Sequence, residues 1–578
     1  MTFEISGNEF LRDGKPIKII SGAVHYFRNM PDTWADILKK LKALGCNCVE
    51  TYCAWNMHEK QQGQYDFSGN LDIASFIKLA QQEDLMVIVR PGPYICSEWE
   101  FGGLPWWIQT GENMEIRCMN PEYIACFDKY LEKLFEQIRP LLCTNGGPII
   151  MLQCENEYGY YGDDKEYLHY LAESYRSKGI DVPLFTSDGT KKENLLDGSV
   201  DGLLPTLNFG SRVEENFKDF NELYPNVPKM CMEMWNGWFD AWGDKEHHTT
   251  SAEDYAQVVD DMLKIGSLNM YMFIGGTNFG FTSGANHYET FTPDVTSYDY
   301  DALLTESGDT TPKYFAVRKV IEKYVAGPLP EVPGNRPKKA YGTAELTEQT
   351  GFFENLNNLS APIHSDVPKC MEKYGTGYGF IAYQTVLNRD YSDAVLSIES
   401  LGDRAQIYIN TDLVDILYIN ENLSTQITAK SGDTLTILCE NMGRANFGPK
   451  MMRKKGIAGR CLLDGKIHFH WNAYPLPMDN LEKLDFTRPV FREKSAFYRG
   501  YIHIEEPCDT FLRLDNFRKG FVTINGFNLG RYWEIGPQKT LYVPASVLKK
   551  GENTILVFES DGIKGLPMVE FCDTPQLG

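Results

Sequence analysis

The most restrictive feature of this sequence is an alternation of short apolar runs with amphipathic stretches between Ile17 and Tyr324. Apolar runs of this length predict strands that are buried on both faces, as in a parallel sheet. Eight such runs occur: Ile17–Phe27, Cys46–Trp55, Asp84–Ile95, Pro148–Gly159, Pro183–Gly189, Leu203–Gly210, Lys229–Gly237 and Ser267–Gly280. Eight strand and helix units in about 310 residues predict a (β/α)8 TIM barrel with long loops.

The stretches between these runs have the period of helices that cover a sheet with one apolar face. They are Asp32–Leu44, Asp72–Gln82, Glu122–Leu142, Lys165–Lys178, Val213–Leu223, Glu253–Ile265 and, after the eighth run, Pro312–Tyr324. Because the active sites of such barrels lie at the C-terminal ends of the strands, each predicted strand end can be searched for chemistry.

A segment rich in Pro and Gly follows the last predicted helix and is typical of a linker. Beyond it the helical period almost disappears, and apolar residues alternate with polar ones as in strands with one buried face. Two parts of this region resemble each other: Arg404–Asn410 with Gly432–Leu438, and Lys519–Asn525 with Gly551–Val557. We interpret the region as two β-sandwich modules of jelly-roll type. The predicted domains are a catalytic barrel (1–325), a linker (326–340), a first β-sandwich (341–478) and a second β-sandwich (479–578).

Two acidic residues stand out at the ends of the predicted fourth and seventh strands, Glu157 and Glu233. Strict alternation along a strand would place Glu155 on the same face as Glu157, with Asn156 opposite. A barrel brings both strand ends to one mouth, where two carboxyl groups fit glycoside hydrolysis. One acid would protonate the leaving oxygen, and the other would act on the anomeric carbon or on water. The alternative is a pair of strand ends with solvated acids.

Composition narrows the class of substrate. The net charge of -23 argues against nucleic acid or an anionic membrane as a partner, because polyanions would be repelled. The predicted strand ends carry carboxylates, amides and aromatics with little Lys or His, which favours a neutral, hydroxyl-rich substrate over a phosphate. The sequence contains neither an HExxH motif nor a paired CxxC spacing, which are typical of metal sites. We therefore expect no metal and no cofactor.

The 14 cysteines are scattered through strand-like and helix-like stretches. A reducing compartment suits so many unpaired thiols, so we expect a cytoplasmic protein. No secretory leader is evident at Met1–Phe10, although a removed leader stays open. No apolar stretch reaches the ~18 residues of a membrane span. The oligomeric state also stays open, a homodimer included.

Four long motifs make the sequence similar to a known family. They are Gly147–Gly159 (GPIIMLQCENEYG), Arg90–Pro105 (RPGPYICSEWEFGGLP), Met272–Gly280 (MFIGGTNFG) and Thr296–Ala302 (TSYDYDA). Together, in this order, they resemble the family 35 glycoside hydrolases, the retaining β-galactosidases. The likeness extends less strictly to both β modules, which would then be galactose-binding-like domains. The arrangement is similar to compact bacterial members that prefer β-1,3-linked galactose.

The resemblance implies specific roles. It makes Glu157 the general acid/base and Glu233 the nucleophile of a retaining exo-β-galactosidase. It assigns Tyr52, Cys96, Ser97, Glu98, Asn156 and Tyr300 to the galactose pocket and places Tyr298 beside the nucleophile. Glu155 is expected to be satisfied by Arg90 or by a backbone amide.

Several alternatives remain at this stage. Trp235, Trp238 and Trp242, with Phe447 from the first β module, could stack on a leaving sugar, and plain packing is an equal alternative for each. A β-glycosidase of another specificity, such as a β-glucosaminidase, would use the same acid pair. A non-catalytic galactose-binding protein would bind the sugar without turnover.

Overall fold

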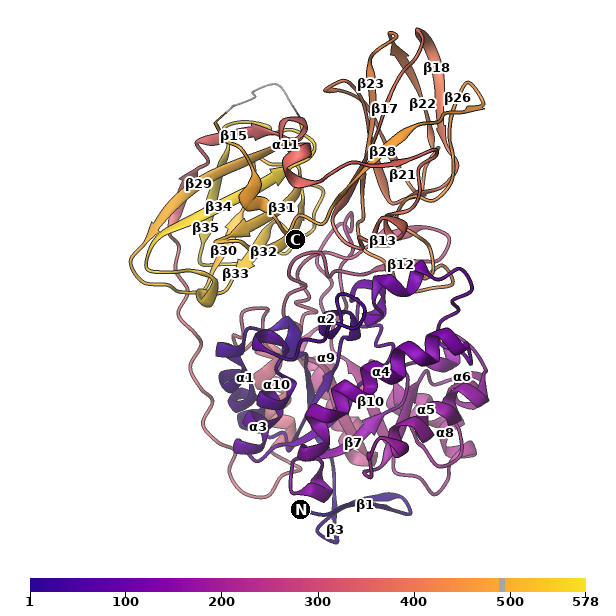
Figure 1. Cartoon of the computed structure of the whole chain (residues 1–578). Coiled ribbons are helices and arrows are strands. Elements are labelled where there is room, and N and C mark those ends of the chain that lie inside the picture. Colours follow the sequence, from indigo (N-terminus) through magenta and orange to yellow (C-terminus); the bar gives the residue numbers. More distant parts are fainter. Residues whose placement is uncertain (488–493) are drawn as a thin grey trace.

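The computed structural model describes residues 1–487 and 494–578. Its lower half in Figure 1 is a closed barrel of eight parallel strands in the order β10-β11-β4-β5-β6-β7-β8-β9. These strands are β4 (Ile20–Val24), β5 (Cys48–Tyr52), β6 (Met86–Arg90), β7 (Ile149–Gln153), β8 (Leu184–Asp188), β9 (Leu204–Asn208), β10 (Met230–Trp235) and β11 (Ser267–Ile274). The predicted TIM barrel is therefore confirmed, with one strand inside each of the eight apolar runs.

The barrel strands are apolar throughout because both of their faces are covered. Every residue of the eight strands is buried except Trp235, which is partly exposed. Side chains that point inward fill the barrel, and those that point outward pack against the ring of helices. The burial explains why the sequence shows continuous apolar runs rather than alternation.

The helices of the ring follow the predicted ranges closely. They are α1 (Pro31–Leu44), α3 (Ile73–Gln82), α4 (Pro121–Ile138), α5 (Lys165–Ser177), α9 (Ala252–Ile265) and α10 (Pro312–Ile321). Helix α1 begins with Pro31 and is capped after Leu44 by Gly45, whose φ of 106° is a left-handed conformation that glycine adopts without strain. The predicted helix Val213–Leu223 is two short helices, α7 (Val213–Asn216) and α8 (Lys218–Leu223). Short helices α2 (Trp55–His58) and α6 (Lys192–Gly198) were not predicted.

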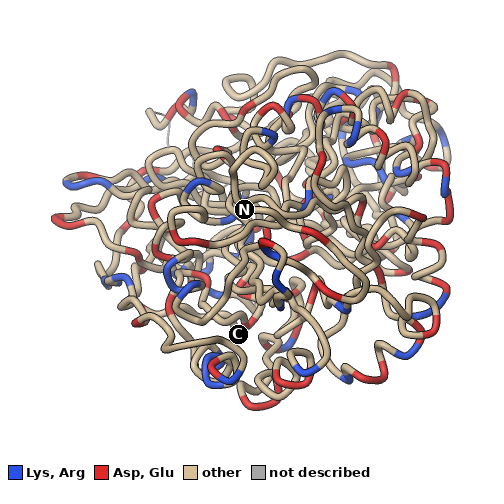
Figure 2. The backbone as a smooth tube through the Cα atoms, turned by 90° about the horizontal axis from the view of Figure 1, so that it is seen from below, with Lys and Arg blue, Asp and Glu red and all other residues tan. Residues whose placement is uncertain are grey.

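A small sheet of β1 (Phe3–Ser6), β2 (Glu9–Arg12) and β3 (Lys15–Ile17) precedes the barrel, and Figure 1 shows it at the end opposite the β modules. Acidic residues are spread over the whole chain with Lys and Arg between them (Figure 2), in keeping with the net charge of -23. Across residues 1–487 and 494–578, no helix has both the length and the apolar character required to cross a membrane.

Two β-sandwiches stand over the other end of the barrel (Figure 1). The first has a six-stranded sheet of β16 (Ile363–Ser365), β28 (Trp471–Leu476), β17 (Phe380–Val386), β23 (Thr434–Glu440), β20 (Arg404–Ile409) and β21 (Asp412–Tyr418). Its four-stranded sheet contains β22 (Ser424–Ala429), β18 (Tyr391–Ile398), β26 (Cys461–Leu463) and β27 (Lys466–Ile467).

The second sandwich combines a five-stranded and a four-stranded sheet. The first of these contains β15 (Glu348–Gly351), β29 (Ala496–Ile504), β34 (Gly551–Glu559), β31 (Lys519–Ile524) and β32 (Phe527–Trp533). The other contains β14 (Gly342–Glu345), β35 (Met568–Cys572), β30 (Thr510–Arg513) and β33 (Thr540–Val543). The two similar sequence pairs occupy equivalent places, because β20 pairs antiparallel with β23 and β31 pairs antiparallel with β34.

The first two strands after the linker belong to the second sandwich, although the strands of the first sandwich follow them in sequence. Directly after the linker, β14 pairs with β35 and β15 pairs with β29, so both strands belong to the sheets of the C-terminal module. The predicted first β-sandwich (341–478) therefore includes two strands that pair with strands of the second sandwich.

The first sandwich is joined to the barrel through a small three-stranded sheet. Strand β24 (Ala445–Phe447) runs parallel to β12 (Ala285–His287), which pairs in turn with β13 (Phe291–Pro293) from a barrel loop. Beside this junction the buried guanidinium of Arg444 lies 2.7 Å from Glu100 of the barrel and 2.6 Å from Glu372 of the sandwich. These contacts fix the position of Phe447, the last residue of β24.

Candidate active site

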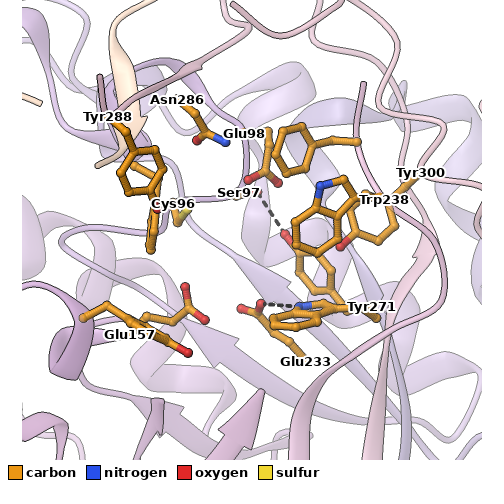
Figure 3. A pocket seen from close by; sticks show the side chains of 14 residues that line it. Cys96, Ser97, Glu98, Glu157, Glu233, Trp238, Tyr271, Asn286, Tyr288 and Tyr300 are labelled. Atoms are coloured by element: carbon orange, nitrogen blue, oxygen red, sulfur yellow. Dashed lines mark hydrogen bonds between the residues drawn. The ribbon is translucent and has the colours of Figure 1, made fainter. Parts of the chain in front are cut away.

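A cavity of about 290 Å³ opens at the C-terminal ends of the barrel strands (Figure 3). Its lining consists of Cys96, Ser97, Glu98, Glu157, Tyr160, Glu233, Trp235, Trp238, Phe239, Tyr271, Asn286, Tyr288, Tyr300 and Phe447. Acids, hydroxyls and aromatic rings dominate this lining, as expected for a pocket that binds a sugar ring. Figure 3 shows the carboxyl groups of Glu157 and Glu233 pointing toward one another across the pocket.

Glu157 reaches the pocket through a break in the regular strand. Strand β7 ends at Gln153, and both Glu155 (φ 61°) and Glu157 (φ 47°) adopt left-handed backbone conformations. Non-glycine residues in this region are strained, and such strain is concentrated at functional sites. Strict alternation no longer applies here, so the expectation that Glu155 and Glu157 share a face is wrong.

Glu155 points away from the pocket and holds the loop in place. Its carboxylate accepts hydrogen bonds from Arg117 Nε at 3.1 Å and Nη2 at 2.8 Å, and from the Tyr167 hydroxyl at 2.9 Å. The backbone N–H of Asn156 also donates to it, at 2.7 Å. The expected backbone amide partner is thus present, but the cation beside Glu155 is Arg117 rather than Arg90.

Glu233, in strand β10, is surrounded by donors. Its Oε1 accepts from the Tyr52 hydroxyl at 2.7 Å and from Arg90 Nη2 at 2.7 Å, and its Oε2 accepts from Trp235 Nε1 at 3.2 Å. A carboxylate with one cation and two further donors is stabilised in its ionised form. This is the state that an attacking group requires.

Glu157 has the opposite environment. The residue is 9% exposed, and the side-chain donor on its Oε1 is Asn208 Nδ2 at 3.1 Å. Burial, followed by the negative charge of Glu233, raises the pKa of Glu157 to about 8. Glu157 therefore carries a proton at neutral pH. Two carboxyl groups whose surroundings separate their protonation states are suited to act as an acid and a base or nucleophile.

The loop after β6 presents three consecutive residues to the pocket in left-handed conformations, Cys96 (φ 56°), Ser97 (φ 63°) and Glu98 (φ 46°). Arg28 holds this loop from behind, since its Nη1 donates to Ser97 Oγ at 2.8 Å and its Nη2 donates to the Ser97 carbonyl. The guanidinium also stacks on the Tyr298 ring at 3.8 Å. The loop is thus supported by a buried cation from the first barrel unit.

Glu98 is the third acid of the pocket. Its Oε2 accepts from the Tyr298 hydroxyl at 2.5 Å. Burial raises the pKa of Glu98 to about 7, although the Tyr298 hydrogen bond and the charge of Arg28 oppose the rise. A carboxyl group that titrates near neutrality can both accept and donate hydrogen bonds to sugar hydroxyls.

Two aromatic groups flank the mouth of the cavity. Trp235, Trp238 and Phe239 form one, with the Trp235 and Trp238 ring centroids 5.5 Å apart. Phe447 from the first sandwich packs between Tyr160 at 6.2 Å and Tyr288 at 6.1 Å to form the other. The first β module therefore contributes a side chain to the cavity. Trp242 lies elsewhere, with its ring 6.4 Å from that of Trp533.

Three residues assigned to the site by resemblance lie behind its surface. Tyr52 donates to Glu233 and to Asn156 Oδ1 at 2.8 Å, and Asn156 Oδ1 also accepts from Arg90 at 2.7 Å. Tyr298 bonds to Glu98 and lies 3.1 Å from the Tyr271 hydroxyl. These side chains orient the carboxyl groups of the cavity and do not themselves line it.

The sequence reasoning did not single out Tyr271, Asn286, Tyr160, Tyr288 or Phe239, all of which line the cavity. Tyr271 carried a usable signal, because a hydroxyl in the middle of a fully buried barrel strand must face something polar. Asn286 and Tyr288 lie in the hairpin of β12 and β13, and no periodic pattern in the sequence identifies that hairpin.

Two groups among the described residues have the donor sets to hold a metal ion: His364, Asp366 and His470 in the first sandwich, and Asp240, Asp244 and His248 after β10. Neither group lines the cavity, and both oxygens of Asp240 already accept hydrogen bonds from His247 and His248.

Comparison with known proteins adds a consistent set of matches. A family model described as glycosyl hydrolases family 35 matches residues 9–324. Models described as the first all-beta domain and the galactose-binding domain of beta-galactosidase match residues 368–477 and 495–553. A β-galactosidase of Bos taurus is 41% identical over 99% of this chain and 94% of its own length. The β-galactosidase of Homo sapiens is 40% identical over 100% of this chain and 91% of its own length. That of Xanthomonas manihotis is 40% identical over 94% of this chain and 92% of its own length.

Proposed function

This chain belongs to glycosyl hydrolase family 35 and is a β-galactosidase, and we propose that it works by double displacement at Glu157 and Glu233. It acts as an exo-hydrolase that releases terminal, non-reducing β-D-galactose. The observation that carries the mechanism is the unequal environment of the two acids. Glu233 has an arginine and two other donors, whereas Glu157 is buried with a single side-chain amide and keeps its proton.

In the first step Glu233 attacks the anomeric carbon while Glu157 gives its proton to the glycosidic oxygen. The bond to the leaving alcohol breaks, and a galactosyl ester forms on Glu233. In the second step the ionised Glu157 takes a proton from water, the water oxygen attacks the same carbon, and the Glu233 carboxylate is released. Two inversions at one carbon return galactose with its original β configuration.

The galactose moiety would bind between Cys96, Ser97 and Glu98 on one side and Tyr271 and Tyr300 on the other. Glu98 would bind a hydroxyl, and a sugar without that hydroxyl would leave the buried acid with Tyr298 but without its sugar partner. Asn156 lies behind the lining, and its amide N–H is the group that would reach forward to the 2-hydroxyl, since Asn156 Oδ1 is occupied by Tyr52, Arg90 and Gln153. Tyr52 and Arg90 would keep Glu233 aligned with the anomeric carbon.

The leaving sugar would lie between the two aromatic groups, with Trp235 and Trp238 on one side and Phe447 on the other. Flat apolar faces of a pyranose stack on such rings. We propose β-1,3-linked galactosides as the preferred substrates. Rates measured with β-1,3-, β-1,4- and β-1,6-linked galactosyl disaccharides would test this preference, and faster hydrolysis of another linkage would contradict it.

The decisive experiment for the roles of the acids is rescue by azide. Glu233→Gly and Glu157→Ala should each lose most hydrolysis without unfolding. Azide should restore activity to both, giving the α-galactosyl azide from Glu233→Gly and the β-galactosyl azide from Glu157→Ala, because azide replaces the nucleophile in one variant and the attacking water in the other. Recovery of the same anomer from both variants would overturn the assignment.

Two other functions predict different behaviour. A β-glucosaminidase would release nitrophenol from the glucosaminide as fast as from the galactoside or faster. A non-catalytic binding protein would bind galactose and release nothing. A panel of nitrophenyl glycosides therefore separates all three functions, and release from the β-galactoside alone supports ours.

We also propose that the protein works in a reducing compartment such as the cytoplasm, because all fourteen cysteines are free thiols. With a net charge of -23, neither nucleic acid nor an anionic membrane is a favourable partner. Fractionation of the source cells followed by an activity assay would test the compartment.

A further inference from the structure

A largely buried charge bridge lies behind the pocket wall formed by Trp238 and Tyr300. Its centre is His247, in the loop between β10 and α9. The ring Nδ1 of His247 is 2.6 Å from Asp240 Oδ2, and Nε2 is 3.4 Å from Asp299 Oδ1. The His247 side chain is only 14% exposed. A histidine that faces a carboxylate with each nitrogen can donate from both only when it is doubly protonated.

The surroundings of His247 keep it charged. Burial works against the cation, but the hydrogen bonds and charges of Asp240 and Asp299 outweigh burial and raise the pKa of His247 to about 10. Other titratable groups surround the two carboxylates. His248 Nδ1 lies 2.8 Å from Asp240 Oδ1, and Asp244 is close to the same two residues. The buried Glu306, Asp301 and Lys313 interact with Asp299. The bridge is therefore a cation between two carboxylates at neutral pH.

Each of the two carboxylates is attached to one part of the pocket wall. Asp240 directly follows Phe239, in the loop that carries Trp238. Asp299 directly precedes Tyr300 and accepts from the backbone N–H groups of Asp301 at 3.2 Å and Glu306 at 2.9 Å.

The turn that Asp299 holds is strained. Tyr300 (φ 63°) and Asp301 (φ 51°) both occupy the left-handed region, which non-glycine residues adopt only when their surroundings enforce it. The Asp299 carboxylate supplies part of that enforcement, and His247 holds the carboxylate. On the pocket side the centroids of the Trp238 and Tyr300 rings lie 6.4 Å apart, and Figure 3 shows the two side chains side by side.

We propose that His247 is a positioning residue, which links Asp240 to Asp299 and so fixes the spacing of Trp238 and Tyr300 at the substrate pocket. His247 does not line the cavity, so it would act only through these two elements. The inference rests on the proposed function, since it takes Trp238 and Tyr300 to contact the bound galactoside.

The test is His247→Gln, which keeps a hydrogen-bonding side chain but removes the charge and one of the two contacts. The KM for 4-nitrophenyl β-galactoside and the inhibition constant of galactose should both rise about tenfold, while kcat changes less than about threefold. A purely structural defect would lower the folded fraction and the apparent kcat, and would leave KM unchanged. The matched control is His248→Ala, which removes a contact to the same Asp240 from a side chain that is 47% exposed. It should leave both constants within about twofold of wild type.

A second variant keeps the proposal testable if His247→Gln does not fold. Asp299→Asn removes the charge at the other end of the bridge, and KM should rise as it does in His247→Gln. Since both changes break one bridge, the double variant should be no worse than the worse single variant. An unchanged KM in the single variants, additive effects in the double variant or an equal effect in His248→Ala would overturn the positioning role. Failure of the wild-type enzyme to hydrolyse any β-galactoside would instead overturn the proposed function.

Discussion

The protonation of Glu157 should set the alkaline limit of activity. Burial and the nearby charge of Glu233 raise the pKa of Glu157 to about 8. A general acid works only while it holds its proton, so kcat/KM should fall as the pH rises through that value. For a group that titrates at about 8, roughly one enzyme molecule in eleven still carries the proton at pH 9, which places kcat/KM about tenfold below its plateau.

The assay compares two substrates that differ only in the leaving group. Methyl β-galactoside has a poor leaving group that must be protonated, and 2,4-dinitrophenyl β-galactoside has one that leaves as a stable anion. Profiles of kcat/KM against pH should show the alkaline fall for the methyl glycoside and little or none for the dinitrophenyl glycoside. An identical fall for both substrates would refute the reasoning, because the titrating group could not then be the acid that assists departure.

The variant Glu157→Gln extends the same argument. It should lose about 10²- to 10⁴-fold in kcat/KM on the methyl glycoside and much less on the dinitrophenyl glycoside, since only the former needs the proton. Glu166→Gln is a suitable control, because Glu166 is exposed on α5. It should leave both pH profiles as they are in the wild type.

Three further predictions concern side chains that support the acids or line the mouth of the cavity. Arg117→Met leaves the buried Glu155 carboxylate without its cation and should cost about 3–5 kcal/mol in chemical denaturation, whereas wild-type stability would contradict the role of the pair. Tyr52→Phe removes one donor from Glu233 and should lower kcat about 10- to 100-fold at unchanged melting temperature, and a loss under twofold would count against it. Phe447→Ala should raise KM several-fold for a galactosyl disaccharide and little for methyl β-galactoside; equal changes for both would show that Phe447 does not contact the leaving sugar.

The barrel could be predicted from the sequence because its strands and helices are short, local and strongly patterned. Burial on both faces makes each strand an apolar run, and the helices carry one apolar face. The position of Glu157 and Glu233 at one mouth follows from that architecture alone. The strand pairings of β14 and β15 could not be predicted, because their partners lie about 150 to 230 residues further along the chain.

The parts of the site that the sequence did not reveal depend on irregular backbone. Glu155 and Glu157 are two residues apart, and left-handed conformations at both send one to Arg117 and the other into the cavity. The bridge through His247 joins two loops that have no periodic pattern. Side-chain contacts of this kind arise only once the barrel has brought the loops together, so sequence spacing carries no record of them.

The central claim is that Glu233 forms a covalent bond to galactose while Glu157 supplies and removes the proton. Incubation with 2,4-dinitrophenyl 2-deoxy-2-fluoro-β-galactoside should trap that bond, because the fluorine slows both steps while the good leaving group speeds only the first. Peptide mass spectrometry should then find the fluorosugar on Glu233. A label on any other residue, or fully active enzyme without a label, would contradict the account.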